Sequence, residues 1–226
     1  MKMKRTMQVL NVLLIAAVVL SLPYYMEHGN LTMKGTISGG FVLLGVLNLV
    51  YCMMTPGLKR NFPVAMVCGL FFAMLGDILL GRNFVVGAGL FALGHVLYFV
   101  AYCMRMRFSR ADLLPGFVIF VLAGGFIAFA PMFDFGGAFM LGVCEVYAVI
   151  ISCMVGKAFT NCLRERSLVN VLLFIGSCMF FFSDLMLVLS WFADAPDITN
   201  TLCCYTYWPA QCLLAHAVYH YSKEAL

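Results

Sequence analysis

Long apolar runs alternate with short polar clusters along the whole chain. Eight of these runs have about the length, 17–25 residues, that crosses the hydrocarbon core of a bilayer. We expect each run to form one transmembrane helix, with bounds good to roughly three residues. The predicted helices cover residues 6–26, 35–54, 63–81, 84–104, 113–131, 136–158, 168–192 and 201–221.

Turn residues between the runs support these bounds. Thr55-Pro56-Gly57 follows the second run, Gly81-Arg82-Asn83 separates the third from the fourth, and Pro131 closes the fifth. The first run ends at Leu22-Pro23-Tyr24-Tyr25, which is bulky where cleavage of a signal peptide requires small residues. We therefore expect the first helix to be retained.

Positive charge is distributed unevenly among the connecting segments. Alternate segments contain most of the Lys and Arg residues, whereas the opposite segments have only Lys34 and Arg82 beside several acids. Because cytoplasmic loops are enriched in Lys and Arg, this pattern predicts eight helices with both termini in the cytoplasm. The predicted cytoplasmic clusters are Lys2/Lys4/Arg5, Lys59/Arg60, Arg105/Arg107/Arg110, Lys157/Arg164/Arg166 and Lys223.

The composition agrees with a membrane protein and with no other class. Of 226 residues, 64% are hydrophobic and 11% are charged, which is more apolar surface than a water-soluble domain of this size can bury. We expect an all-α, polytopic bundle that forms a single transmembrane domain over residues 1–226. The net charge of +4 reflects the basic loops rather than nucleic-acid binding, and the 10 cysteines lack the paired spacing of zinc or redox sites.

Two acids lie inside predicted helices. Leu75-Gly76-Asp77-Ile78-Leu79-Leu80 is in the third, and Phe182-Ser183-Asp184-Leu185-Met186-Leu187 is in the seventh. Because a carboxylate in a bilayer is costly, Asp77 and Asp184 are candidate functional residues. The repeated small-Asp-x-x-Leu element also predicts a 4+4 parallel repeat, with two halves related by an axis along the membrane normal.

Three further polar residues are predicted at similar depth. At about 1.5 Å per residue, all five polar positions lie roughly 6–16 Å from the outer helix ends, so we expect them to line one cavity. His95, Glu145 and Gln211 join the two acids in this group. Plainer interpretations stay open, since His95 and Gln211 can be interhelical hydrogen-bond partners and Glu145 can be an inert partner of His95.

Two buried carboxylates suit acid–base chemistry, because one can hold a proton while the other is ionised. A pocket within the membrane favours an amphiphilic substrate. We expect the aromatic residues Phe84, Phe91, Tyr98 and Trp208 to hold its chain, and the outer cations Lys34 and Arg82 to pair with a lipid phosphate. No Gly-x-Ser-x-Gly or His-Glu-x-x-His motif is present, which argues against a serine lipase or a zinc protease.

Four motifs in order resemble the YhhN family of membrane lysoplasmalogenases. They cover residues from about 34 to 215. The motifs are Leu75-Gly76-Asp77-Ile78-Leu79-Leu80; Phe84-x-x-Gly87-Ala88-Gly89-Leu90-Phe91-x-x-Gly94-His95-x-x-Tyr98; Gly176-x-x-x-Phe180-x-x-Ser183-Asp184-x-x-Leu187; and Tyr207-x-x-Ala210-Gln211. One departure is Lys34-Gly35-Thr36, where family members often have Lys-Pro.

The resemblance implies an eight-helix enzyme of a bacterial cytoplasmic (inner) membrane that needs no cofactor. It implies hydrolysis of the vinyl ether bond of lysoplasmalogens, which gives a fatty aldehyde and glycerophosphoethanolamine or glycerophosphocholine. The catalytic pair of the family falls on Asp77 and Asp184. The residues expected to bind substrate are Lys34, His95, Tyr98, Glu145, Tyr147, Tyr207 and Gln211.

Two alternatives remain open from the sequence. In the first, Asp77, His95, Glu145 and Asp184 bind a metal ion that activates water, and the protein is a metal-dependent lipid hydrolase. In the second, the intramembrane acids belong to a proton-coupled transporter of a small amphiphile.

Overall fold

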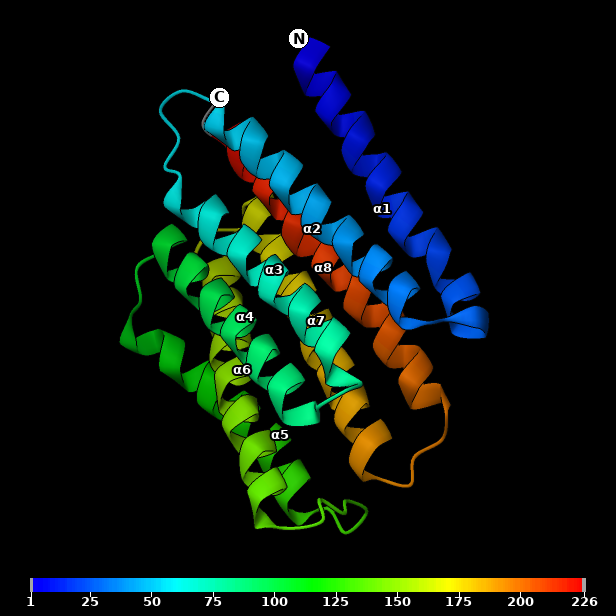
Figure 1. Cartoon of the computed structure of the whole chain (residues 1–226). Coiled ribbons are helices and arrows are strands. Elements are labelled where there is room, and N and C mark those ends of the chain that lie inside the picture. The colour runs from blue at the N-terminus through cyan, green and yellow to red at the C-terminus, as the bar shows by residue number, and fades with distance from the viewer. Residues whose placement is uncertain (1, 225–226) are drawn as a thin grey trace.

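The computed structural model describes residues 2–224, and every regular element in that range is helical. The order of the elements along the chain is shown in Figure 1. The elements are α1 (Lys2–His28), α2 (Leu31–Met53), α3 (Asn61–Leu80), α4 (Phe84–Arg105), the short 3-10 helix η1 (Arg110–Asp112), α5 (Leu113–Phe129), α6 (Ala138–Arg164), α7 (Leu168–Phe192) and α8 (Ile198–Glu224).

The helix bounds follow the predicted runs, except that α1 and α2 begin four residues before their predicted starts at residues 6 and 35. Helices α3, α4, α5 and α7 begin and end within two residues of prediction. Asn30 and Asn83 accept hydrogen bonds from the backbone amides of Met33 and Val86, which caps α2 and α4. The prediction for the sixth helix was wrong at its end, since α6 continues to Arg164.

Seven helices, α1 to α7, are long and apolar enough to cross a membrane, so the chain is an integral membrane protein. Helix α8 is as long as α1 and α6 but less apolar. It packs against α7, α2, α1 and α3, so its neighbours bury polar side chains that lipid would not tolerate. The crossing of α8, the sidedness of the termini and the repeat stay predictions.

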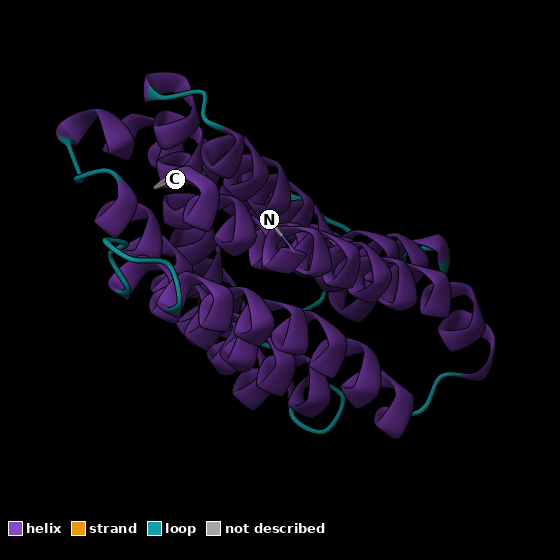
Figure 2. Cartoon of the chain, turned by 90° about the horizontal axis from the view of Figure 1, so that it is seen from above, coloured by secondary structure: helices purple, strands orange, loops and turns teal. Residues whose placement is uncertain are grey.

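Helix α8 lies inside the bundle, and α5 lies at its edge. Figures 1 and 2 show the α5–α6 hairpin standing beside the other helices. Within the described residues, α5 packs only on α6 and η1. The first and last described segments lie at the same end of the bundle, where the Tyr219 hydroxyl donates to the carbonyl of Lys4.

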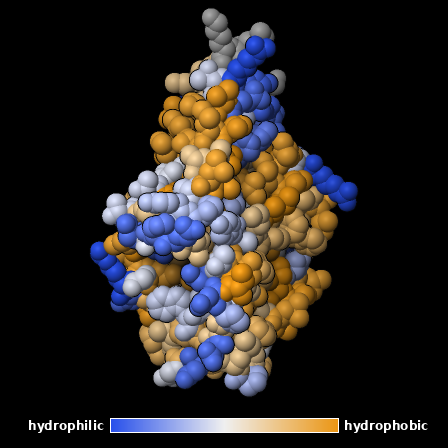
Figure 3. Space-filling view, turned by 90° about the vertical axis from the view of Figure 1, so that its right-hand side faces the viewer, coloured by the Kyte–Doolittle hydropathy of each residue, from blue (hydrophilic) through white to orange (hydrophobic). Residues whose placement is uncertain are grey.

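Glycines allow two helix pairs to approach closely. A Cβ on Gly87 of α4 would lie 2.5 Å from the Cα of Leu80 on α3, and one on Gly156 of α6 would lie 2.5 Å from the amide nitrogen of Gly116 on α5. Small residues at such crossings are typical of helix packing in membranes. The outer face of the bundle is largely apolar, and Figure 3 shows broad hydrophobic patches with hydrophilic side chains gathered at one end and in the lower half.

Two interhelical hydrogen bonds, one from α2 to α8 and one from α6 to α4, have matching donors and acceptors. Asn48 of α2 donates to the carbonyl of Ala215 on α8, at 3.0 Å. Asn161 of α6 donates to the carbonyl of Tyr102 on α4, at 2.9 Å. Both the asparagines and the carbonyls differ by 113 in residue number. A duplicated four-helix unit predicts such a correspondence.

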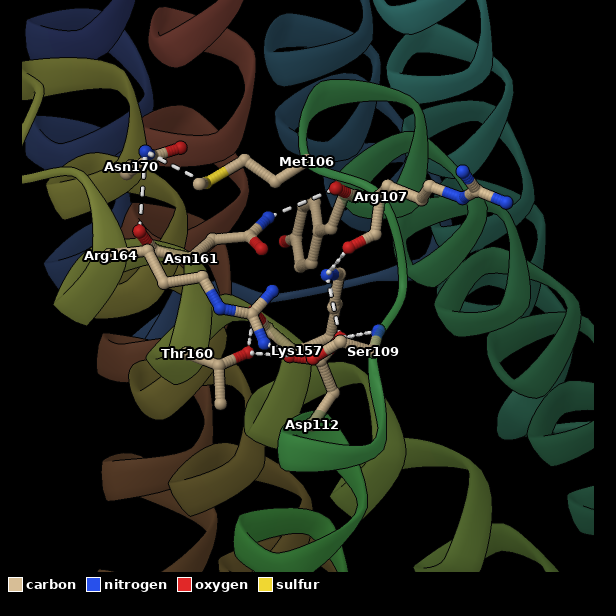
Figure 4. Close-up of polar contacts among 10 residues, drawn as sticks. Met106, Arg107, Ser109, Asp112, Lys157, Thr160, Asn161, Arg164 and Asn170 are labelled. Atoms are coloured by element: carbon tan, nitrogen blue, oxygen red, sulfur yellow. Dashed lines mark hydrogen bonds and ion pairs between the residues drawn. The ribbon is translucent and has the colours of Figure 1, made fainter.

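A buried ion-pair cluster joins η1 to α6 at the end opposite the α5–α6 connection. Figure 4 shows the Asp112 carboxylate between Lys157, Thr160 and Arg164, and the Lys157 ammonium lies 2.9 Å from Asp112 Oδ2. The Lys157 side chain is 0% exposed. Its assignment to a basic loop was therefore wrong: it is a helical residue whose charge is neutralised within the protein.

Candidate functional site

Asp77 is buried near the end of α3 that the charge pattern predicts to be the outer one, and it receives partners from two other helices. The Lys34 ammonium of α2 lies 2.9 Å from Asp77 Oδ1. The Ser38 hydroxyl, one turn further along α2, donates to Asp77 Oδ2. The Trp208 indole of α8 donates to the Ser38 oxygen at 3.0 Å. A buried carboxylate needs such partners, because leaving a buried charge unpaired costs several kcal/mol.

Asp184 of α7 has different partners. The Tyr147 hydroxyl of α6 donates to Asp184 Oδ2 at 2.7 Å. His95 Nε2 of α4 lies 2.7 Å from the Tyr147 oxygen and 3.3 Å from Asp184 Oδ2. Since the Tyr147 proton points to Asp184, the Tyr147 oxygen accepts from His95 Nε2. His95 Nδ1 is buried and has no hydrogen-bond partner among the described residues.

Both aspartates therefore receive partners from two other helices. Asp77 is contacted from α2 and, through Ser38, from α8, whereas Asp184 is contacted from α6 and α4. The chemistry differs, because Asp77 has a primary amine beside it and Asp184 has a phenol and an imidazole.

A polar cavity lies between the aspartates and towards the outer end of the bundle. Both Asp77 and Asp184 line it, together with Lys34, Tyr207 and Trp208. Asn200 and the adjacent Cys203-Cys204 line it from the first turns of α8. Two carboxylates from α3 and α7 thus face one space, as the sequence predicted.

A second, apolar cavity adjoins the polar one. Asp184, Leu80, Phe91 and Leu187 line both cavities. The apolar cavity has a volume of about 40 Å³ and extends among α4, α5, α6 and α7. Phe84 and Phe91 line it, and the sequence analysis expected both to contact the hydrocarbon chain of the substrate.

The remaining predicted site residues divide into two groups. Tyr207 lines the polar cavity and its hydroxyl donates to the carbonyl of Ala73 at 3.0 Å. Tyr98 and Gln211 contact each other instead, with the Tyr98 hydroxyl 2.7 Å from Gln211 Oε1, and both side chains are buried away from the cavities. For these two residues the plainer interpretation, an interhelical hydrogen bond, fits the structure.

Glu145 does not join the cluster. Its carboxylate faces α5, where a Cβ on Gly124 would lie 2.8 Å from Glu145 Oε2. Glu145 Oε1 has no hydrogen-bond partner among the described residues, and neither cavity is lined by this side chain. The expected cavity shared by five polar residues was therefore wrong for Glu145 and Gln211, and also for His95, which contacts Asp184 but lines neither cavity. The interpretation that paired Glu145 with His95 was also wrong.

Sequence reasoning missed Ser38 and assigned Lys34 incompletely. Ser38 lies four residues after Lys34, so helical spacing places both on one face of α2. That spacing was a usable signal. Lys34 was expected to meet a lipid phosphate, but its ammonium already neutralises Asp77. Arg82, in the exposed turn between α3 and α4, is the other outer cation.

The four residues of the metal hypothesis do not form a metal-binding group. Asp184 and His95 are in contact, but Asp77 has its own partners on α2, and Glu145 faces α5. Across residues 2–224, no group of three or more His, Cys, Asp or Glu side chains has an arrangement that can hold a metal ion.

Comparison with known proteins identifies the family. No curated protein and no solved structure matched the chain. The family model described as YhhN matches residues 37–218, which is most of the chain. This segment includes both aspartates and all their described partners except Lys34, which lies just before it. The chain therefore belongs to the YhhN family.

Proposed function

We propose that this protein hydrolyses the vinyl ether bond of lysoplasmalogens by acid–base catalysis with Asp77 and Asp184. The observation that carries the proposal is that both carboxylates line one polar cavity while their partners differ. Membership of the YhhN family supports the reaction. A pair of carboxyl groups in unlike surroundings is the usual basis for separate acid and base roles.

The partners suggest which aspartate takes which role. Asp77 has the Lys34 ammonium at 2.9 Å, so its negative charge is balanced, and it suits the ionised partner. Asp184 has the Tyr147 hydroxyl and the His95 ring but no described Lys or Arg contact, so it suits the neutral acid. A carboxylic acid held neutral in an apolar site is an established device for donating a proton.

The reaction balances with these two groups and one water molecule. Asp184 gives its proton to the β-carbon of the vinyl ether, which leaves an oxocarbenium ion. Water attacks the carbon of the C–O bond and gives a proton to Asp77, which forms a hemiacetal. When the hemiacetal collapses, its hydroxyl proton moves to the glycerol oxygen through water as the bond between that oxygen and the former vinyl carbon breaks. The products are the fatty aldehyde and the glycerophospho-alcohol, and the proton taken up by Asp77 returns to Asp184 through water.

The experiment that tests this function is aldehyde release from a lysoplasmalogen by the purified protein in detergent, with and without a chelator. We expect aldehyde under both conditions. Aldehyde that disappears with the chelator and returns with one divalent metal would instead support the metal-dependent hydrolase. No aldehyde from well-folded protein would reject vinyl ether hydrolysis.

A transporter remains the second candidate, because the equivalent contacts of the two halves fit the internal repeats common in transporters. Detergent separates the two functions, since it removes the gradient that transport requires. Aldehyde formed in detergent excludes a pure transporter. Uptake of an intact amphiphile into proteoliposomes, without aldehyde, would support one.

A further inference from the structure

The acid–base steps leave the apolar cavity without a role. Its lining has almost no polar groups besides Asp184 and Tyr147, the two residues that face the proposed reaction. The lining atoms of this apolar cavity of about 40 Å³ lack dispersion contacts on one side, and an apolar ligand that enters the cavity supplies them. Such a space suits the hydrocarbon part of an amphiphile.

The outer end of this cavity is covered by aromatic rings. Phe84 at the start of α4 packs against Trp191 and Phe192 at the end of α7, with ring centroids 5.1 and 4.9 Å apart. Phe135 of the α5–α6 connection packs on Phe192 at 4.8 Å. The two outer connections are also joined by a backbone bridge between Phe133 and Ala193. These ring contacts narrow the direct path to the cavity past Phe84.

The opposite end of the cavity leads towards lipid. Phe181 lines both this cavity and a groove between α5, α6 and α7 that is lined by apolar side chains such as Val118 and Phe174. Helix α5, which supplies Ala123 and Ile127 to the cavity wall, is held only by α6 and η1 among the described residues. Of the helices that line the cavity, α5 has the fewest packing partners, so we expect the cavity to open to lipid beside α5.

The lining residues place the two cavities on different sides of Asp184. Along α6, the apolar cavity is lined from Val143 to Ile151, so it extends about 6 Å along the helix axis on either side of Tyr147. The polar cavity lies on the side of Asp184 that faces α2 and α8, and has Lys34 in its wall. A lysolipid whose polar group lies in the polar cavity and whose chain lies in the apolar cavity matches both spaces.

We propose that the apolar cavity is the binding site for the alkenyl chain, that the chain enters sideways from the bilayer beside α5, and that Ala148 limits its length. Ala148 is 4% exposed and lies on α6 between Tyr147 and Ile151, so a larger side chain there would narrow the cavity past the reacting carbons. The identity of the chain rests on the proposed function. The site for a lysolipid chain rests on the two cavities alone.

The first test measures binding without hydrolysis. The probe is an alkyl-ether lysophospholipid, which lacks the vinyl group, with a photoreactive diazirine at the chain end. After irradiation in detergent, we expect labelled peptides that contain Ala123 or Ile151, and we expect excess unlabelled alkyl-ether lysolipid to suppress the labelling. Labelling of these peptides that competitor does not reduce would overturn the chain site.

The second test measures chain selectivity. Ala148→Leu fills part of the cavity, whereas Ala128→Leu adds the same atoms at an exposed position of α5 and serves as the control. For Ala148→Leu, we expect the ratio of kcat/KM for long-chain over short-chain lysoplasmalogens to fall by about tenfold or more, as a pocket narrowed by a few methylenes predicts. An unchanged ratio in a folded variant would contradict the proposal.

The two proposals fail in different ways. Competable labelling with no aldehyde from any lysoplasmalogen would reject the vinyl ether reaction and keep the lysolipid site. Aldehyde release by the wild type, with labelling confined to other helices, would keep the reaction and reject the chain site.

Discussion

Lys34 and Tyr147 make matching contacts, since each extends from its own helix to the aspartate of the next helix along the chain, from α2 to α3 and from α6 to α7. The Lys34 ammonium lies 2.9 Å from Asp77, and the Tyr147 hydroxyl lies 2.7 Å from Asp184. Their residue numbers differ by 113, as do those of Asn48 and Asn161. One position thus supplies a cation to one acid and a neutral donor to the other.

Both aspartates should be required for turnover. We expect Asp77→Asn and Asp184→Asn each to lower aldehyde release by about 100-fold or more, because each removes one partner of the acid–base pair. Asn keeps the volume, so both proteins should accumulate in the membrane. Asp194→Asn, in the exposed α7–α8 connection, is the control and should act like the wild type. Near-normal turnover in both variants would refute the mechanism.

Lys34 should stabilise the fold through Asp77. Lys34→Met leaves a buried carboxylate without its cation, and we expect a loss of roughly 1–3 kcal/mol in the free energy of unfolding, measured by thermal unfolding in detergent. The double variant Lys34→Met/Asp77→Asn should recover most of that stability while staying inactive. Additive losses in the double variant would show that the two side chains do not interact.

Tyr147 should matter for activity beyond its effect on stability. Tyr147→Phe removes one hydroxyl that donates to Asp184. Tyr102→Phe removes a more deeply buried hydroxyl, which lies 2.9 Å from the Ser177 hydroxyl oxygen and lines neither cavity. We expect each change to cost about 0.5–1.5 kcal/mol of stability, with a fall in kcat only for Tyr147→Phe. Equal kcat values for the two variants would assign Tyr147 a structural role.

Removing the charge of Asp112 should lower the free energy of unfolding more than removing the charge of Lys157. Asp112→Asn leaves the fully buried Lys157 without any carboxylate contact, and we expect a loss of about 3–5 kcal/mol in stability. Lys157→Met should be milder, since Arg164 and Thr160 still contact Asp112. Thermal unfolding of the two variants measures the difference, and the reverse order would contradict this account.

Local patterns in the sequence predicted the helices well. The bounds of α7 were predicted correctly, because Ser167 caps its first turn and the apolar run ends at Phe192. Asp77 and Asp184 were also found from sequence, since a lone acid in an apolar run stands out regardless of its surroundings. The end of α6 was missed because Thr160, Asn161 and Arg164 read as a polar loop unless the groups that they contact are known.

The sequence by itself determined that this chain is a bundle of membrane helices with two acids on its third and seventh helices, because length and hydropathy are properties of each segment alone. Only the tertiary structure decided that Lys34 meets Asp77, that Tyr147 and His95 meet Asp184, and that Glu145 meets neither. Those contacts depend on the rotation and tilt of helices packed against one another, which residues far apart in the chain set together.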